Sequence, residues 1–238
     1  MAEPRLDVEG LDVRIGAFHL EDVTFSVEPG EVVGYLGHNG AGKTTTFRTM
    51  ADLIRPREGT VRVGTLDHRR DERDFKQVVC FVGENRHVYD RMRVRDVLQL
   101  AARLYPGWDH EWCAQTCAHL RLPLEARAKH LSTGMRTKLS LVLGLSPRPR
   151  FVVMDEPTSA LDVASASWVW QHVDAEVAAG RLGVLVSSHS QEEVMTQCTR
   201  VVVLEEGRIV ERIDLLAERE RALDSVAVAM GRSGDRGR

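Results

Sequence analysis

The sequence predicts an α/β fold in which a mainly parallel sheet forms the core, with an antiparallel β subdomain and an inserted helical subdomain. Short apolar runs alternate with segments of helical periodicity, a pattern typical of parallel strands joined by helices. These runs are residues 32–36, 78–82, 151–154, 184–187 and 201–204. Residues 6–27 instead alternate apolar and polar side chains, which predicts half-exposed antiparallel strands. Residues 94–146 keep helical spacing and predict the insertion.

The remaining elements follow from the same periodicities. The segment 45–54 predicts a helix, 60–63 a short strand, and the charge-rich stretch 67–76 the solvated face of a helix. Further helices are expected at 94–104, 110–121, 133–145, 163–179 and 190–197. We therefore expect one domain over 1–222 with its helical subdomain at about 85–148. The polar, glycine-rich end of 223–238 predicts a disordered tail.

Composition limits the partners that the chain can have. A net charge of −3 over 238 residues offers no electrostatic reason to bind nucleic acid, so no such partner is expected. The longest apolar runs, 139–145 and 201–204, are far shorter than the roughly 18–20 residues that cross a bilayer. The first residues lack a signal-peptide pattern. We expect a cytoplasmic chain, unless a partner holds it at a membrane.

Four cysteines, Cys80, Cys113, Cys117 and Cys198, are expected to be reduced thiols. Cys113 and Cys117 would share one face of a helix, which allows a metal interpretation. The chain has no second pair at zinc-site spacing, so packing thiols are the favoured interpretation.

A glycine-rich loop between the apolar strand at 32–36 and the following helix predicts a phosphate-binding site. Its residues are Gly37, His38, Asn39, Gly40, Ala41, Gly42, Lys43, Thr44 and Thr45. Glycines let the backbone N–H groups converge, and the helix N-terminus adds positive potential. Lys43 can reach the β- and γ-phosphates, and the Thr44 hydroxyl can ligate Mg²⁺. The loop therefore predicts a nucleotide site in which Mg²⁺ accompanies the phosphates; the alternative is a glycine-rich turn without a ligand.

Two acids directly follow the apolar strand 151–154. Asp155 can hold Mg²⁺ directly or through water, and Glu156 can polarise a water for attack on the γ-phosphate. Acids after a strand are also common as helix caps, so this signal is weak without the glycine loop. Ser132 at the start of the helix 133–145 is a good N-cap; with Gly134 and the helix dipole it could also form a second anion site.

Taken together, these motifs make the chain resemble the ATP-binding subunit of an ABC transporter over residues 6–212. The resemblance implies a P-loop NTPase fold with a RecA-like core. It implies that residues 157–162, which end at Asp162, form the D-loop, and that His189 is the switch histidine contacting the γ-phosphate. It also implies that Ser132 and Gly134 bind the γ-phosphate of ATP held by an opposite subunit.

The partners follow from the same resemblance. They are a second cassette, identical or similar, and a separate transmembrane permease that keeps the chain at the inner face of the membrane. The segments 105–109 and 131–139 are more narrowly similar to small bacterial exporter ATPases of peptide-antibiotic resistance and stress response. Residues 85–89 would face the coupling helix of the permease.

Several positions depart from the family pattern. Thr133 and Met135 replace glycine and glutamine in the signature loop, and Glu84 occupies the Q-loop position, where it could approach Mg²⁺. Ile15 stands where an aromatic residue would stack on the base, and Phe18 could substitute for it.

Three alternatives stay open at this point. A soluble ABC ATPase without a transporter would lack a membrane partner. A P-loop kinase would form a phosphorylated product. A weakly hydrolysing regulatory subunit would bind nucleotide with little turnover.

Overall fold

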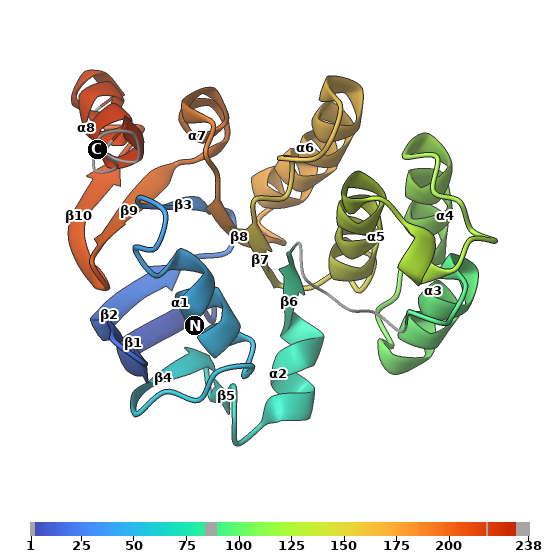
Figure 1. The fold of residues 1–238 in the computed structure, drawn as a ribbon, viewed down its shortest axis with the longest axis horizontal. Coiled ribbons are helices and arrows are strands. Elements are labelled where there is room, and N and C mark those ends of the chain that lie inside the picture. The colour runs from blue at the N-terminus through green and yellow to red at the C-terminus, as the bar shows by residue number, and fades with distance from the viewer. Residues whose placement is uncertain (1–2, 84–89, 218, 232–238) are drawn as a thin grey trace.

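The computed structural model describes residues 3–83, 90–217 and 219–231 (Figure 1). The strands are β1 Leu6–Ile15, β2 Phe18–Val27, β3 Val32–Leu36, β4 Glu58–Val63, β5 Leu66–Asp67, β6 Val79–Val82, β7 Phe151–Asp155, β8 Gly183–Ser187, β9 Arg200–Glu205 and β10 Arg208–Asp214. The α-helices are α1 Lys43–Met50, α2 Glu72–Val78, α3 Val94–Leu104, α4 His110–His119, α5 Thr133–Leu145, α6 Val163–Ala178, α7 Gln191–Gln197 and α8 Arg219–Gly231, with a 3₁₀ turn at Ala128–His130.

A six-stranded sheet in the order β10-β9-β3-β8-β7-β6 forms the core. Its strands pair in parallel from β9 to β6, and β10 is an antiparallel edge strand. Alternate residues of its inner strands point to opposite sides, and elements packed on both faces bury them. Val152 and Met154 of β7 enter the core under α5, α6 and α7, whereas Phe151 and Val153 face α1 and the second sheet. The predicted parallel core is therefore confirmed.

The second sheet is four-stranded, in the order β2-β1-β4-β5, and all of its pairs are antiparallel. It packs with α1 and α2 against the core sheet, at the lower left of Figure 1. Its inward side chains, such as Val8 and Val23, are fully buried. The period-two alternation over 6–27 predicted this arrangement correctly, because alternate side chains of a strand meet opposite environments.

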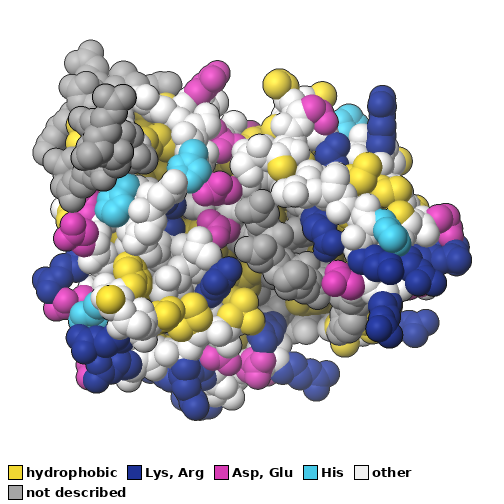
Figure 2. All heavy atoms as spheres, viewed as in Figure 1, with side chains coloured by type: hydrophobic (Ala, Val, Ile, Leu, Met, Phe, Trp, Pro, Cys, Tyr) yellow, Lys and Arg dark blue, Asp and Glu magenta, His cyan; other side chains and the backbone are white. Residues whose placement is uncertain are grey.

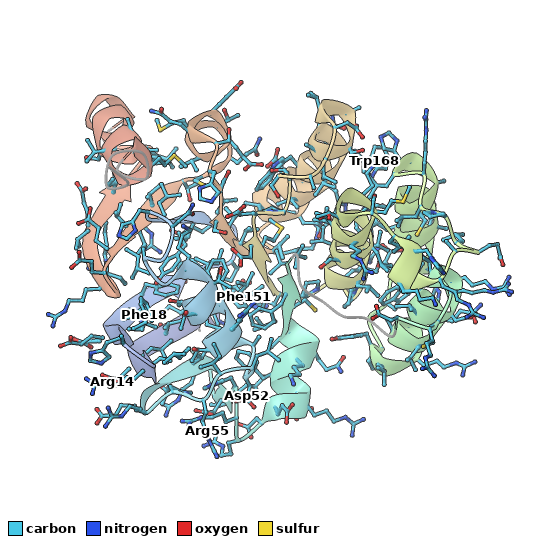
Figure 3. The ribbon with its side chains drawn as sticks, in the orientation of Figure 1. Arg14, Phe18, Asp52, Arg55, Phe151 and Trp168 are labelled. Atoms are coloured by element: carbon cyan, nitrogen blue, oxygen red, sulfur yellow. The ribbon has the colours of Figure 1, made fainter. Side chains whose placement is uncertain are left out.

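The helices α3, α4 and α5 form the helical subdomain around a small apolar core of their own. Lys and Arg side chains are frequent over its outer surface, at the right of Figure 2. It joins the main core through α5, which contacts β6, and through α6, which carries Trp168 (Figure 3). The Trp168 ring stacks on His119 of α4 with ring centroids 4.0 Å apart. A second pair, Trp112 and His172, crosses the same two helices.

Two expectations at the level of elements are wrong. The segment 67–76 is not only a solvated face, because Asp67 and His68 are buried and Phe75 on α2 is 1% exposed in the core. The tail after residue 223 is not disordered as far as Gly231, since α8 continues to that residue. Val226 and Ala229 on α8 are buried in the main core, and this apolar contact stabilises the helix. Residues 232–238 lie outside the described part of the chain.

Candidate functional site

The loop between β3 and α1 has the backbone that the glycine pattern predicts. Gly37, Gly40 and Gly42 have φ values of 155°, 84° and 117°, a region that side chains with a Cβ rarely adopt. At Gly42, a Cβ would also lie 2.7 Å from the Phe18 ring. Gly42 caps the N-terminus of α1, so the free N–H groups of the first turn are available to an anion.

Lys43 is 7% exposed and bends back over this loop. Its Nζ donates hydrogen bonds to the carbonyl oxygens of Gly37, at 2.6 Å, and His38, at 3.3 Å. Burial lowers the pKa of the Lys43 ammonium, whereas Glu156 and Asp155 nearby raise it. A positive charge is therefore held inside the glycine loop, where a phosphate would meet it.

Thr44 and Asp155 lie together although the chain separates them widely. Thr44 Oγ1 donates to Asp155 Oδ2 at 2.9 Å, and Ser187 Oγ donates to Asp155 Oδ1 at 2.6 Å. Asp155 is the last residue of β7, and Ser187 is the last residue of the neighbouring parallel strand β8. A hydroxyl and a carboxylate are the hard oxygen ligands that Mg²⁺ prefers beside a phosphate. These side chains therefore fit the predicted cation.

Glu156 and His189 form a close pair beside this group. His189 Nε2 lies 2.7 Å from Glu156 Oε1, and the two side chains are 46% and 35% exposed. Glu156 has a left-handed backbone, with φ 50°, and its N–H donates to the carbonyl and hydroxyl oxygens of Ser187 at 3.2 and 3.1 Å. A non-glycine residue in this conformation is costly, and such residues cluster at functional sites.

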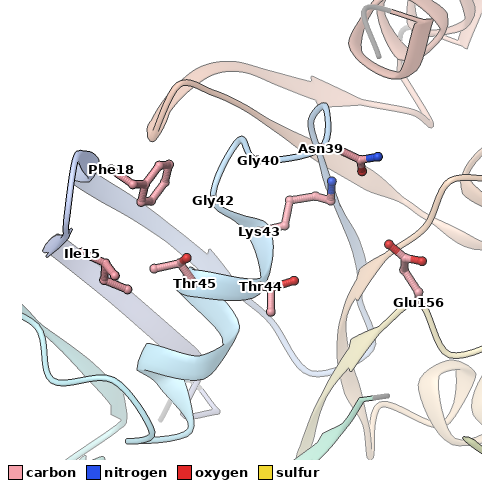
Figure 4. Close-up of a pocket in the computed structure, with 9 residues that line it drawn as sticks. All are labelled: Ile15, Phe18, Asn39, Gly40, Gly42, Lys43, Thr44, Thr45 and Glu156. Atoms are coloured by element: carbon pink, nitrogen blue, oxygen red, sulfur yellow. The ribbon is translucent and has the colours of Figure 1, made fainter. Parts of the chain in front are cut away.

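A pocket of about 390 Å³ lies along the glycine loop and reaches Glu156 (Figure 4). Ile15 and Phe18 lie at one end of it and Glu156 at the other, with the glycine loop between them. The remaining lining residues are Asn39, Gly40, Gly42, Lys43, Thr44 and Thr45. The end with Ile15 and Phe18 offers apolar side chains to the face of a nucleobase, and the glycine loop in the middle can bind an anion. A nucleoside triphosphate requires this distribution of properties.

The second predicted anion site is built on α5 and lies away from this pocket. Ser132 caps α5 by accepting a hydrogen bond from the Met135 N–H at 3.3 Å. A Cβ on Gly134 would lie 2.6 Å from the Ala160 carbonyl oxygen, so only glycine allows this close approach to the loop 157–162. Neither Ser132 nor Gly134 lines the pocket of its own chain.

Asp162 ends that loop as the N-cap of α6. It accepts hydrogen bonds from the Ser165 N–H at 2.8 Å and the Ser165 hydroxyl at 2.9 Å, and it pairs with Lys138 of α5 at 3.4 Å. The bond from the Ser165 N–H is the main reason that the pKa of the Asp162 carboxyl falls to about 2. Asp162 therefore remains ionised and links α5 to α6.

Comparisons with known proteins agree with this geometry. Residues 20–159 match the family model described as "ABC transporter". The chain belongs to the ABC transporter family. It is 35% identical over 214 residues to the ABC transporter ATP-binding protein NatA of Bacillus subtilis, covering 86% of each chain. It is 33% identical to the Nod factor export ATP-binding protein I of Paraburkholderia xenovorans, covering 79% of this chain and 64% of that protein.

A solved ATP-binding subunit of an ABC transporter superposes with a TM-score of 0.83 at 26% identity, covering 95% of this chain and 99% of that one. As a member of the family, the chain is an ATP-binding protein and an ATP hydrolase with the ABC cassette fold. Within the described residues, this ABC ATPase has no helix that could span a bilayer.

One observed contact in the site was not predicted, and two predictions stay predictions. Glu84 at the Q-loop and residues 85–89 lie outside the described residues. The hydrogen bond from Ser187 to Asp155 was not predicted, although a serine at the end of a strand before His189 was a visible signal. Both Ile15 and Phe18 line the pocket, so the structure keeps both as candidates for the base contact.

The cysteines do not form a metal site in the described part of the ABC ATPase. All four are buried and none is in a disulfide, and no group of three His, Cys, Asp or Glu side chains there is arranged to hold an ion. Cys113 and Cys117 belong to the core of the helical subdomain.

Proposed function

We propose that this ABC ATPase binds ATP·Mg²⁺ between two cassettes and drives a separate transmembrane permease, most simply an exporter. The observation that carries the proposal is the pairing of Glu156 with His189 beside the Thr44–Asp155 contact, at the end of a pocket lined by Lys43. This arrangement supplies a base, a cation site and a phosphate-binding charge within one cleft.

In the proposed site, the N–H groups of residues 37–45 and the Lys43 ammonium neutralise the phosphates of ATP. Thr44 and Asp155 would hold Mg²⁺, which would supply positive charge beside the phosphates. Glu84 is proposed to approach the same cation. Asp162 is proposed to take part in nucleotide binding from the interface between the two cassettes.

Glu156 accepts a proton from water as the water oxygen bonds to the γ-phosphorus and the bond to the β–γ bridging oxygen breaks. The products are ADP and inorganic phosphate. His189 orients the Glu156 carboxylate and contacts the γ-phosphate.

The position of the second anion site outside the pocket supports a two-cassette mechanism. Ser132 and Gly134 lie outside the pocket of their own chain, so they are proposed to complete the site of a facing subunit, which is identical or similar. Such a dimer would bury the exposed Met135 at the start of α5, which is 39% exposed here. Closure around two ATP molecules would provide the movement that the permease uses.

The exporter assignment rests on resemblance. The Nod factor export protein among the relatives is named for export, and the segments 105–109 and 131–139 are similar to small exporter ATPases. The proposed location is the cytoplasmic face of the membrane, through the permease, with no nucleic-acid partner.

Affinity purification from detergent-solubilised membranes tests this proposal. We expect one polytopic membrane protein to copurify, and ATP hydrolysis by the complex to exceed that of the isolated chain. A chain that hydrolyses ATP but copurifies with no membrane protein would be a soluble ABC ATPase. A chain that binds ATP without turnover would be a regulatory subunit.

A further inference from the structure

We infer that Glu193 is a positioning residue that joins the loop 157–162 to the loop carrying His189. Its carboxylate lies between them and accepts three hydrogen bonds. Oε1 accepts from Thr158 Oγ1 at 2.6 Å and from Trp170 Nε1 at 2.8 Å, and Oε2 accepts from Ser188 Oγ. Glu193 is therefore bonded to both loops and to α6 at the same time.

Each loop is hydrogen-bonded to Glu193 through a residue close to the proposed catalytic pair, Glu156 and His189. Thr158 follows Glu156 by two residues, and Ser188 directly precedes His189. Ser188 is 7% exposed, and its hydroxyl also accepts a hydrogen bond from the Ser190 N–H at 3.0 Å. The bonds from these two hydroxyls to Glu193 therefore hold the backbones next to Glu156 and His189, whose side chains lie 2.7 Å apart.

The loop 157–162 is connected at its other side to the helix that carries the second anion site. The Ala160 carbonyl packs on Gly134, and Asp162 pairs with Lys138, both on α5. A continuous set of contacts therefore runs from α5 through this loop and Glu193 to His189. Glu193 is the point at which the contacts pass from one loop to the other.

A carboxylate suits this position for a chemical reason. Thr158, Ser188 and Trp170 all present donors to Glu193, and an ionised carboxylate is an acceptor at both oxygens. Hydrogen bonds to a charged acceptor are also stronger than those between neutral groups. A glutamine would replace one acceptor oxygen by an N–H₂ donor, so one hydroxyl would have to reverse its role and accept, and the charge that strengthens all three hydrogen bonds would be lost.

Steady-state kinetics test the inference, which rests on the ATP hydrolysis of the proposed function. We expect Glu193→Gln and Thr158→Val each to lower kcat at least about tenfold while ATP affinity stays within about twofold of the parent. The matched control is Glu192→Gln, on the exposed side of the same helix, which we expect to keep the parent kcat. Trp170→Phe removes the donor from α6 alone and should reduce thermal stability more than kcat.

Equal loss of kcat in Trp170→Phe and Thr158→Val would overturn the inference, because Glu193 would then only support the fold. A double-mutant cycle adds a second criterion. Thr158→Val and Ser188→Ala should affect kcat non-additively, since both act through one carboxylate. Additive effects would mean that the two loops are positioned independently.

Hydrogen exchange separates failure of this inference from failure of the proposed function. Glu193→Gln should raise amide exchange in both 157–162 and 187–190, and Glu192→Gln in neither. Faster exchange in only one of the loops would overturn the inference, whether or not the chain hydrolyses ATP. Absence of hydrolysis in the parent, with the exchange result as expected, would instead contradict the proposed function.

Discussion

His189 Nε2 lies 2.7 Å from Glu156 Oε1, although the two residues come from the ends of different strands. β7 ends just before Glu156, and β8 ends two residues before His189. Because the strands are parallel neighbours, their carboxyl ends meet at one edge of the sheet. The pair is thus a direct product of the sheet order.

Glu156→Gln should lower kcat for ATP hydrolysis by at least about 10²-fold, because the amide cannot accept the proton of the attacking water. ATP binding should remain, since Lys43 and the glycine loop are untouched. Phosphate release and ATP titration measure the two effects. We also expect the variant to accumulate as an ATP-bound dimer, and hydrolysis near the parent rate would mean that Glu156 is not the base.

Lys43→Ala should weaken the binding of ATP·Mg²⁺ itself. The ammonium is buried in the loop and would contact phosphate in the ground state as well as in the transition state. Isothermal titration calorimetry measures the change. The control is Lys76→Ala, which removes an exposed lysine paired with Glu72. If the parent and Lys43→Ala bound ATP·Mg²⁺ with equal affinity, the nucleotide site would lie elsewhere.

Ser132→Arg should leave ATP binding by a single chain intact and prevent the closed dimer. Ser132 does not line its own pocket, and the longer side chain would occupy the space proposed for the facing γ-phosphate. Sedimentation of Glu156→Gln with and without Ser132→Arg, in ATP, makes the comparison. Thr65→Arg in the same background is the control, at an exposed position between β4 and β5. Dimers of equal abundance would contradict a role for Ser132 across the interface.

Phe18→Ala should lower ATP affinity about tenfold, because contact of an aromatic side chain with a base is worth about 1–3 kcal/mol. Ile15→Ala should have a smaller effect, since an aliphatic side chain cannot stack. Val210→Ala, at an exposed site outside the pocket, is the control. A loss of affinity in Ile15→Ala alone would assign the base contact to Ile15.

His172 should make the fold less stable at acidic pH. Burial lowers the pKa of its imidazole; Glu176 and Asp109 oppose this shift, and Arg148 and Arg181 favour it. The folded state therefore binds the proton less well than the unfolded chain. The contribution to the free energy of unfolding is full above the ordinary pKa of about 6.5 and decreases as the pH falls toward the lower folded pKa.

His172→Phe keeps a ring against Trp112 and removes the titration. Its Tm should therefore fall less than that of the parent between pH 7.5 and pH 5.5. Equal decreases in Tm would show that other groups, such as the buried His68, account for the acid sensitivity.

Local pattern was sufficient for most of the secondary structure. The helix predicted at 133–145 has those bounds in the structure, and the strands around residues 6–27 follow their period-two alternation. The glycine loop was also predictable, because its backbone requires left-handed φ values that glycine adopts freely. The end of the chain was misjudged, because the burial of Val226 and Ala229 that stabilises α8 is not a local property.

The amino-acid pattern was enough to predict the types of chemical group at the site: a phosphate loop, two acids after a strand, and a histidine. Which of these groups meet depends on the tertiary fold. Thr44 and Asp155 are 111 residues apart and hydrogen-bonded, whereas Ser132 and Gly134 are nearer to Asp155 in sequence and lie outside the pocket. The physical reason is that strand order in a parallel sheet, unlike helical or strand periodicity, depends on contacts between distant segments. For the same reason, only the folded chain reveals Glu193 between its two loops.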